Sequence, residues 1–220
     1  MSHWITLDTP QGPVSAWEAT PATKPRGGLV VIQEIFGVNG HIRAVADGYA
    51  AAGYAALAPA FFDPVRKNVE LGYGEAGFAE GRELIGKLGF DAALRIVAAA
   101  RDRLEAFGKV GTVGYCWGGT VALLAAARLG LPSVSYYGAR NAAFLDEPPQ
   151  APVMFHFGEK DTSIPMEAVR QHRQKLPQMQ TYAYPAGHAF NRDVDPKAYD
   201  ADSATLALQR TLAFFAEHIG

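Results

Sequence analysis

Short apolar runs alternate with longer amphipathic segments along most of the chain, and this pattern predicts strands and helices in turn. Two alternating runs near the N-terminus, 4–7 and 14–19, flank Thr9-Pro10-Gln11-Gly12 and predict a hairpin at a sheet edge. Apolar runs that predict further strands follow at 28–33, 54–58, 110–114, 131–137, 153–157 and 181–184, and the run at 28–33 is typical of a strand buried on both faces. Helical periodicity is found at 41–52, 90–107, 120–129, 166–175 and 201–218.

Strands that alternate with helices predict an α/β fold, in which a mostly parallel sheet has helices on both faces. The segment 59–89 is rich in glycine, carries several charges and is predicted to be irregular. A segment of that length between regular elements is usually functional. No repeat or linker divides the chain, so we expect a single domain over residues 1–220.

Composition and charge narrow the possible functions. The formal net charge of -2 gives no reason to expect nucleic acid or a membrane surface as a partner. The single cysteine cannot form an internal disulfide or complete a cysteine-rich zinc site. The N-terminal residues lack a signal-peptide pattern, and no apolar window is long enough for a membrane span, so we expect a cytoplasmic protein.

That cysteine lies in the segment Gly114-Tyr115-Cys116-Trp117-Gly118-Gly119, between a predicted strand and a predicted helix. A nucleophile on a sharp strand-to-helix turn is the nucleophile elbow of α/β-hydrolases, where the usual residue is serine. The flanking glycines suit a strained turn whose neighbours need to lack a Cβ. The alternative is a buried structural cysteine, because free cysteine is among the most buried residue types.

Reactive groups collect at the carboxyl ends of parallel strands, and three candidates follow successive strands. Cys116 follows the strand at 110–114, Asp161 the strand at 153–157, and His188 the strand at 181–184. Their order along the chain, nucleophile, acid, histidine, is that of α/β-hydrolases. His188 would take the thiol proton, and Asp161 would orient the imidazole. Taken alone, Asp161 could be a turn residue and His188 a surface histidine.

The strand at 28–33 is followed by a further set of candidates. Glu34 could act as a base for the thiol, or it could be a salt-bridged or capping glutamate. The backbone amides of Ile35 and Trp117 are the natural oxyanion donors, since one belongs to the loop after this strand and the other follows the nucleophile.

On these motifs the chain resembles the dienelactone hydrolase family, whose members are also called carboxymethylenebutenolidases. The resemblance covers nearly the whole chain and rests on four segments: Gln33 to Asn39, Gly114 to Gly119, Gly158 to Asp161, and Ala186 to Phe190. It implies an α/β-hydrolase fold and a triad of Cys116, His188 and Asp161. It also implies that Glu34 pairs with the thiol and helps to form the thiolate once substrate binds.

The family substrate is an anionic unsaturated lactone that is opened to maleylacetate, and two arginines grip its carboxylate. The resemblance matches Arg192 to one of these and Arg82 to the other; a guanidinium suits bidentate carboxylate binding. Either arginine could instead be a solvated surface charge. After Arg82 the chain departs from the family pattern, with Gly86 and Gly89 where family members place aromatic residues, and this predicts a wider or more mobile pocket.

The sequence therefore predicts a hydrolase that opens an anionic lactone through a cysteine nucleophile and a thioester, in a monomer or small homo-oligomer. No cofactor or metal is implied. A broader carboxylesterase or thioesterase of the same fold is the alternative within enzymes. Two other rivals are a nucleotide-binding protein, in which Cys116 would stand where the phosphate loop needs a glycine, and a binding protein that has lost its activity.

Overall fold

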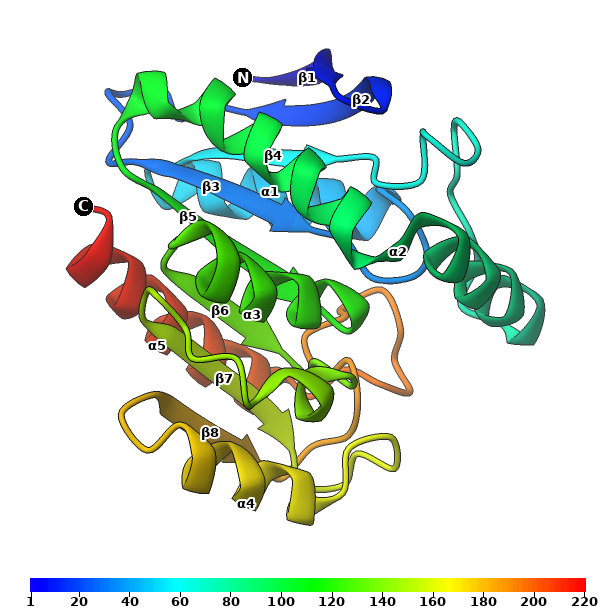
Figure 1. The fold of residues 1–220 in the computed structure, drawn as a ribbon, viewed down its shortest axis with the longest axis vertical. Coiled ribbons are helices and arrows are strands. Elements are labelled where there is room, and N and C mark those ends of the chain that lie inside the picture. The colour runs from blue at the N-terminus through cyan, green and yellow to red at the C-terminus, as the bar shows by residue number, and fades with distance from the viewer. The chain divides into compact units, whose positions relative to one another are not determined.

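The computed structural model describes residues 1–220 (Figure 1). By their contacts these residues divide into two compact units. The first comprises residues 1–112 with 219–220, and the second comprises residues 113–218. The expectation of a single domain stays a prediction. No helix combines the length and apolar character that a membrane span requires.

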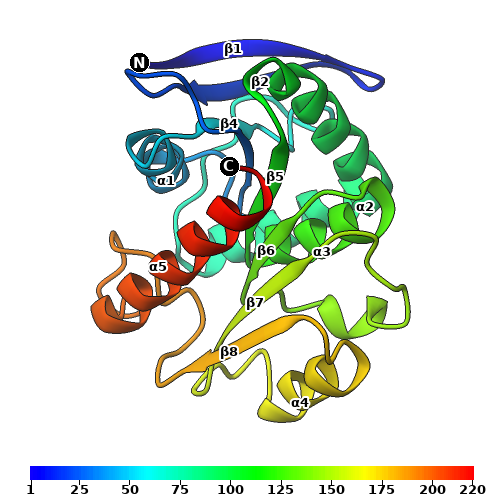
Figure 2. The same ribbon diagram turned by 90° about the vertical axis from the view of Figure 1, so that its left-hand side faces the viewer.

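The first unit begins with the antiparallel hairpin of β1 (Ser2–Thr9) and β2 (Gly12–Ala19), which confirms the predicted edge hairpin. Its strands lie in the order β1, β2, β4 (Ala55–Pro59), β3 (Gly28–Ile32) and β5 (Val110–Tyr115). Strand β4 runs antiparallel to β2 but parallel to β3. Both β3 and β4 are buried along their whole length, as their apolar runs predict. In Figure 2, α1 (Gly40–Ala51) and α2 (Glu75–Leu104) cover opposite faces of these strands.

The prediction that 59–89 is irregular is wrong in its second half, because α2 begins at Glu75. Leu84, Ile85 and Leu88 form a buried stripe at helical spacing. The glycines within this segment make that periodicity hard to recognise in the sequence. Gly89 has φ 71°, so α2 is two helices joined at a kink, and the second of them is the helix predicted from residue 90. A short 3-10 turn, η1 (Glu105–Phe107), follows.

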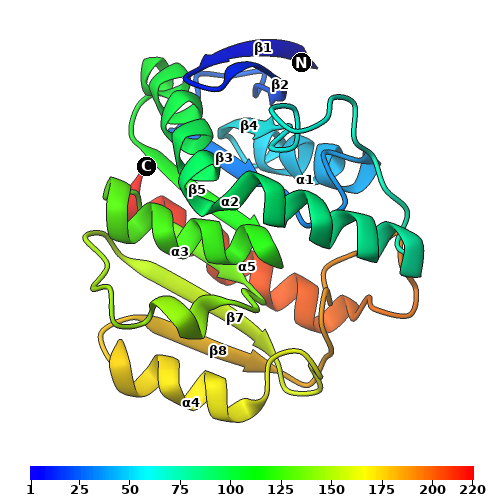
Figure 3. The same ribbon diagram turned by 45° about the vertical axis from the view of Figure 1, so that its right-hand side comes forward.

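The second unit begins within β5, which it shares with the first unit, and its further elements are α3 (Trp117–Leu129), β6 (Ser133–Tyr136), η2 (Asn141–Phe144), β7 (Val153–Gly158), α4 (Met166–Lys175), β8 (Gln180–Tyr184) and α5 (Ala201–His218). The strand order is β5-β6-β7-β8, in which β6, β7 and β8 are parallel. Figure 3 shows α3 and α4 on one face of these strands and α5 on the other. The mostly parallel α/β architecture is confirmed.

A buried hydrogen-bonded network joins α5 to the strands of this unit. His156 on β7 is fully buried, and its two ring nitrogens lie 2.8 Å from the Tyr184 hydroxyl and 3.1 Å from the Thr211 hydroxyl. Arg210 donates to the Tyr184 hydroxyl over 3.1 Å. Burial, with the nearby charge of Arg210, lowers the pKa of His156 to about 3, so this histidine is neutral in the folded protein.

His156 should therefore make the folded protein sensitive to acid. Below its ordinary pKa of 6.5 the unfolded chain binds a proton there and the folded chain does not, until the pH reaches about 3. Within that window the free energy of unfolding should fall by up to about 1.4 kcal/mol for each pH unit. Urea unfolding of the wild type should thus lose about 2 to 3 kcal/mol more than His156→Gln between about pH 6.5 and about pH 4.5. Identical pH dependences would contradict this assignment.

Candidate active site

Cys116 stands at the turn between β5 and α3, with φ 57° and ψ -117°. Few residues other than glycine adopt this conformation, which costs on the order of 1–3 kcal/mol. Two hydrogen bonds hold the turn: the Cys116 N–H donates to the Tyr136 carbonyl over 3.0 Å, and the Gly119 N–H donates to the Cys116 carbonyl over 3.0 Å. The predicted elbow is therefore present, and the Cys116 side chain is half-buried.

The glycines beside Cys116 are required by close backbone contacts. A Cβ on Gly114 would overlap the carbonyl oxygen of Gly118, and a Cβ on Gly119 would lie 2.6 Å from the carbonyl oxygen of Tyr136. Real Cβ atoms essentially never come that close to another atom. The expectation that neighbours of the nucleophile need to lack a Cβ is confirmed at both positions.

The loops after β7 and β8 lie against each other. The Glu159 N–H donates to the Tyr184 carbonyl over 2.8 Å, and the Lys160 N–H donates to the Ala186 carbonyl over 2.9 Å. Gly158 permits this approach, because a Cβ there would overlap the Ala186 carbonyl oxygen. These contacts hold Asp161 beside the loop that carries His188.

The structure brings Cys116, Asp161 and His188 together. The Nδ1–H of His188 donates to Oδ2 of Asp161 over 2.6 Å, and the other Asp161 oxygen accepts the Ser163 N–H over 2.8 Å. His188 is also hydrogen-bonded to the Cys116 side chain. Three residues that follow separate strands therefore form one hydrogen-bonded chain, so Asp161 is more than a turn residue.

The charge state of His188 follows from these contacts. Burial opposes the charged imidazolium, but the hydrogen bonds to Asp161 and Cys116 and the charges of those groups outweigh it and raise the pKa of His188 to about 10. The thiolate is the reactive form of cysteine, and His188 is hydrogen-bonded to the side chain that would carry that charge. This arrangement can hold a nucleophile and the proton that a leaving group needs.

Tyr137 lies beside His188 and is a further candidate, which the sequence analysis did not identify. Its ring centroid lies 4.8 Å from that of His188, and its hydroxyl donates to Oδ1 of Asn191. Both Tyr137 and Ala189, on either side of this contact, have positive φ values of 37° and 59°. Tyr137 comes directly after β6, so the strand-end rule that selected the triad could have found it too.

The other two candidates in the second unit are buried. Trp117 is the first residue of α3, where backbone N–H groups lack acceptors within the helix. Arg192 is only 6% exposed, and its Nη1 donates to Oδ2 of Asp195 over 3.2 Å. Arg192 is therefore not a solvated surface charge.

The remaining candidates belong to the first unit. Glu34 and Ile35 lie in the loop after β3, two and three residues beyond its end, and both are buried. Helix α2 closely approaches this loop, since a Cβ on Gly81 would overlap the Ile35 carbonyl oxygen. Arg82, the residue after Gly81 on α2, is exposed. Its guanidinium lies 5.9 Å from the ring centroid of Phe78.

Comparison with known proteins gives a consistent result. The family model for the dienelactone hydrolase family matches residues 14–219. A protein of Synechocystis sp., described as a proposed carboxymethylenebutenolidase, is 35% identical over 85% of this chain and 84% of its own length. Carboxymethylenebutenolidase 1 of Cupriavidus pinatubonensis is 31% identical, over 93% of this chain and 92% of that protein.

A solved structure agrees with the fold. The crystal structure of a proposed dienelactone hydrolase from Klebsiella pneumoniae has a TM-score of 0.85 and 28% identity, and the match covers 99% of each chain. The predicted α/β-hydrolase fold is thereby confirmed.

Proposed function

Because the chain belongs to the dienelactone hydrolase family, we propose that this hydrolase opens an anionic unsaturated lactone, with Cys116 as its nucleophile. The observation that supports this most is the hydrogen-bonded chain from Asp161 through His188 to Cys116. A thiol in a strained elbow beside an imidazolium is the arrangement expected of a cysteine hydrolase. The substrate of the proposal is a dienelactone, and the product is maleylacetate.

In the first half of the reaction, the Cys116 thiolate attacks the lactone carbonyl carbon. The carbonyl π electrons move onto oxygen, and the amides of Ile35 and Trp117 stabilise that oxyanion. When the carbonyl re-forms, the bond to the ring oxygen breaks. The ring opens, and the leaving oxygen receives a proton from the imidazolium of His188 to give an enol. The acyl group is then held on Cys116 as a thioester.

In the second half, His188 is neutral and acts as the base. It takes a proton from a water molecule, whose oxygen attacks the thioester carbonyl. Collapse of the second oxyanion expels the Cys116 thiolate, releases the carboxylic acid and regenerates the imidazolium. The sum is one lactone and one water converted to one ring-opened acid. Asp161 orients the imidazole through both steps.

Glu34 has a role in this proposal that is separate from that of His188. It is almost fully buried in the loop after β3, and a carboxylate in such a position can serve as a proton acceptor. We assign it to help remove the thiol proton when substrate enters, as the family resemblance implies.

Arg192 is proposed to bind the substrate carboxylate, because its guanidinium is buried four residues beyond His188. Arg192→Ala should lower kcat/KM for a dienelactone by about 10- to 100-fold, the range expected for losing a charge-assisted hydrogen bond. Turnover of neutral p-nitrophenyl acetate should change by less than about 3-fold, since that substrate has no carboxylate. Steady-state rates on both substrates give the comparison.

Two further variants sharpen this test. Arg192→Lys keeps the charge but loses the planar fork, so it should fall between wild type and Arg192→Ala on the lactone. Arg170→Ala removes an exposed arginine of α4 and should leave both rates unchanged. Equal losses on the anionic and the neutral substrate in Arg192→Ala would rule out the carboxylate role.

One observation favours the alternative of a broader carboxylesterase or thioesterase. Arg82, the second proposed carboxylate ligand, is exposed on α2 and stacks near Phe78. A site with a single buried arginine would select less strongly for anionic substrates. Rapid neutral-ester turnover that depends on Cys116, without dienelactone turnover, would support this alternative.

The setting of the enzyme stays as the sequence predicts: cytoplasmic, without a cofactor, and a monomer or small homo-oligomer. A catalytic thiol is best preserved in a reducing compartment, and this supports the cytoplasmic proposal.

A further inference from the structure

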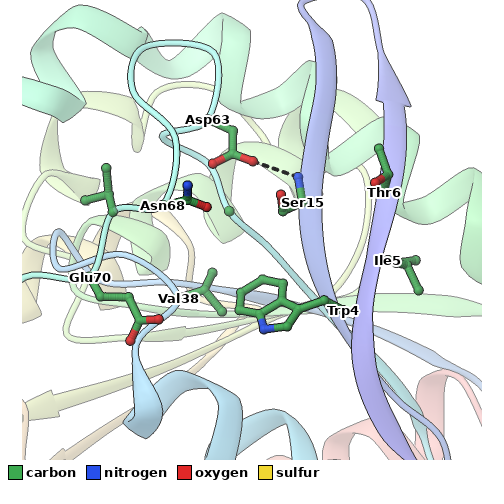
Figure 4. Close-up of a pocket in the computed structure, with 10 residues that line it drawn as sticks. Trp4, Ile5, Thr6, Ser15, Val38, Asp63, Asn68 and Glu70 are labelled. Atoms are coloured by element: carbon green, nitrogen blue, oxygen red, sulfur yellow. Dashed lines mark hydrogen bonds between the residues drawn. The ribbon is translucent and has the colours of Figure 1, made fainter.

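A cavity of about 510 Å³ lies in the first unit, between the N-terminal hairpin and the loop after β4. Its volume is within the range of small-molecule binding sites. Figure 4 shows the Asp63 carboxylate on one side of this space and the indole of Trp4 on the other, with Asn68 and Ser15 between them. We call it the hairpin cavity. None of the triad residues lines it.

Asp63 is the group in this cavity whose charge is not balanced. It is only 7% exposed, and its Oδ2 accepts the Ser15 N–H over 2.8 Å (Figure 4). No lysine, arginine or histidine pairs with it. A backbone N–H satisfies one oxygen, but it leaves a buried negative charge without a counter-ion, which is costly.

The second acid of the cavity is already neutralised. Glu70 forms an ion pair with Arg43, in which Nη1 lies 2.7 Å from Oε1, and the same nitrogen donates to the Val38 carbonyl over 2.7 Å. The guanidinium carbon of Arg43 is 5.9 Å from the ring centroid of Trp4. The Arg43 guanidinium therefore pairs with Glu70 and not with Asp63.

The wall opposite Asp63 suits the apolar part of a ligand. Trp4 is 45% exposed, although it packs edge-on against Trp17 with ring centroids 5.5 Å apart. An indole face attracts cations within about 6 Å and also covers apolar groups. Thr6, Ser15 and Asn68 add polar residues to the lining of the cavity.

We propose that the hairpin cavity binds a small organic ammonium ion, whose charged nitrogen contacts Asp63 and whose apolar part lies against Trp4. An ammonium group supplies the counter-ion that Asp63 lacks, and its N–H groups can bond the second carboxylate oxygen. This binding site is distinct from that of the lactone reaction, since none of the residues proposed for that reaction lines the cavity.

Calorimetric titration with benzylammonium chloride, at low ionic strength, tests the proposal on the intact protein. The wild type should bind this probe saturably. Benzyl alcohol, which has the same shape without the charge, should bind at least about 10-fold more weakly, because it cannot replace the missing counter-ion. At equal concentrations, benzylammonium should raise the melting temperature of the protein more than benzyl alcohol does, because it binds more tightly.

The variants separate charge from shape. Asp63→Asn keeps an oxygen for the Ser15 N–H but removes the charge, so Kd should rise at least about 10-fold. Trp4→Leu removes the aromatic face and should raise Kd by about 3- to 10-fold. Asp8→Asn removes an exposed carboxylate from the same hairpin, outside the cavity, and should change Kd by less than about 2-fold.

Three results would overturn the proposal. The first is the absence of saturable binding by the wild type at concentrations up to about 10 mM. The second is equal affinity of Asp63→Asn and wild type. The third is equal binding of benzyl alcohol and benzylammonium, which would mean that the cavity accepts apolar groups without regard to charge.

Discussion

Cys116→Ala should abolish lactone turnover while leaving the protein folded, with kcat reduced by at least about 10³-fold. Alanine cannot form the thioester, so only the contribution of substrate binding and of the oxyanion donors would remain. Cys116 has a strained backbone with φ 57°, and alanine is no harder to accommodate there. Circular dichroism and the urea midpoint establish that the variant is folded, and steady-state kinetics measure the loss.

Cys116→Ser gives the more discriminating result. A hydroxyl is far harder to deprotonate than a thiol, and an imidazolium that already carries its proton cannot accept the serine proton. We expect at least about a 100-fold loss of kcat. Because Cys116 is the only cysteine in the chain, iodoacetamide should attach one label to the wild type and none to either variant, as mass spectrometry can measure. Activity within about 10-fold of wild type in Cys116→Ser would contradict the thiolate mechanism.

The elements that the sequence predicted well are those in which one pattern dominates. Helices α4 and α5 have the predicted bounds, because each has apolar positions at helical spacing and a clear start. The strands β3, β4 and β7 are buried along their whole length, so their apolar runs stand out. The first half of α2 was missed because glycine-rich composition argues against a helix, and only tertiary packing of its buried stripe compensates.

The proximity of the three proposed triad residues could be predicted because the order of the strands, more than the local sequence, brings them together. Parallel strands present their carboxyl ends at one edge, so Cys116, Asp161 and His188 could be assigned from strand ends alone. The contacts of Tyr137 with His188 and Asn191 depend on side-chain rotamers and on positive φ values, and no sequence motif indicates either of these. The hairpin cavity is equally invisible in the sequence, since Trp4, Ser15 and Asp63 belong to three separate segments.

Asp161→Asn should reduce kcat by about 10³- to 10⁴-fold, the scale of the corresponding change in a serine protease triad. An asparagine amide can donate to Nδ1 of His188, which would leave the proton on the nitrogen that faces Cys116. That tautomer cannot accept a proton from water in the second half of the reaction. Asp146→Asn, an exposed carboxylate paired with Lys175, should retain full activity and serves as the matched control.

The same variant should change the titration of His188, which distinguishes an electrostatic role of Asp161 from a merely structural one. In the wild type, hydrogen bonds and charges raise the pKa of His188 to about 10 against the effect of burial. Without the Asp161 carboxylate, burial weighs more and the pKa should fall, as an NMR titration of the His188 ring can measure.

The stability of the protein should follow that titration. A raised pKa stabilises the folded state fully below the unfolded value of 6.5, and the gain is lost as the pH rises from there to about 10. Wild type should therefore lose more free energy of unfolding over this interval than Asp161→Asn does. If both proteins lost the same amount and the His188 titration did not move, Asp161 would not be the group that holds the imidazolium, and another source for its charge would have to be found.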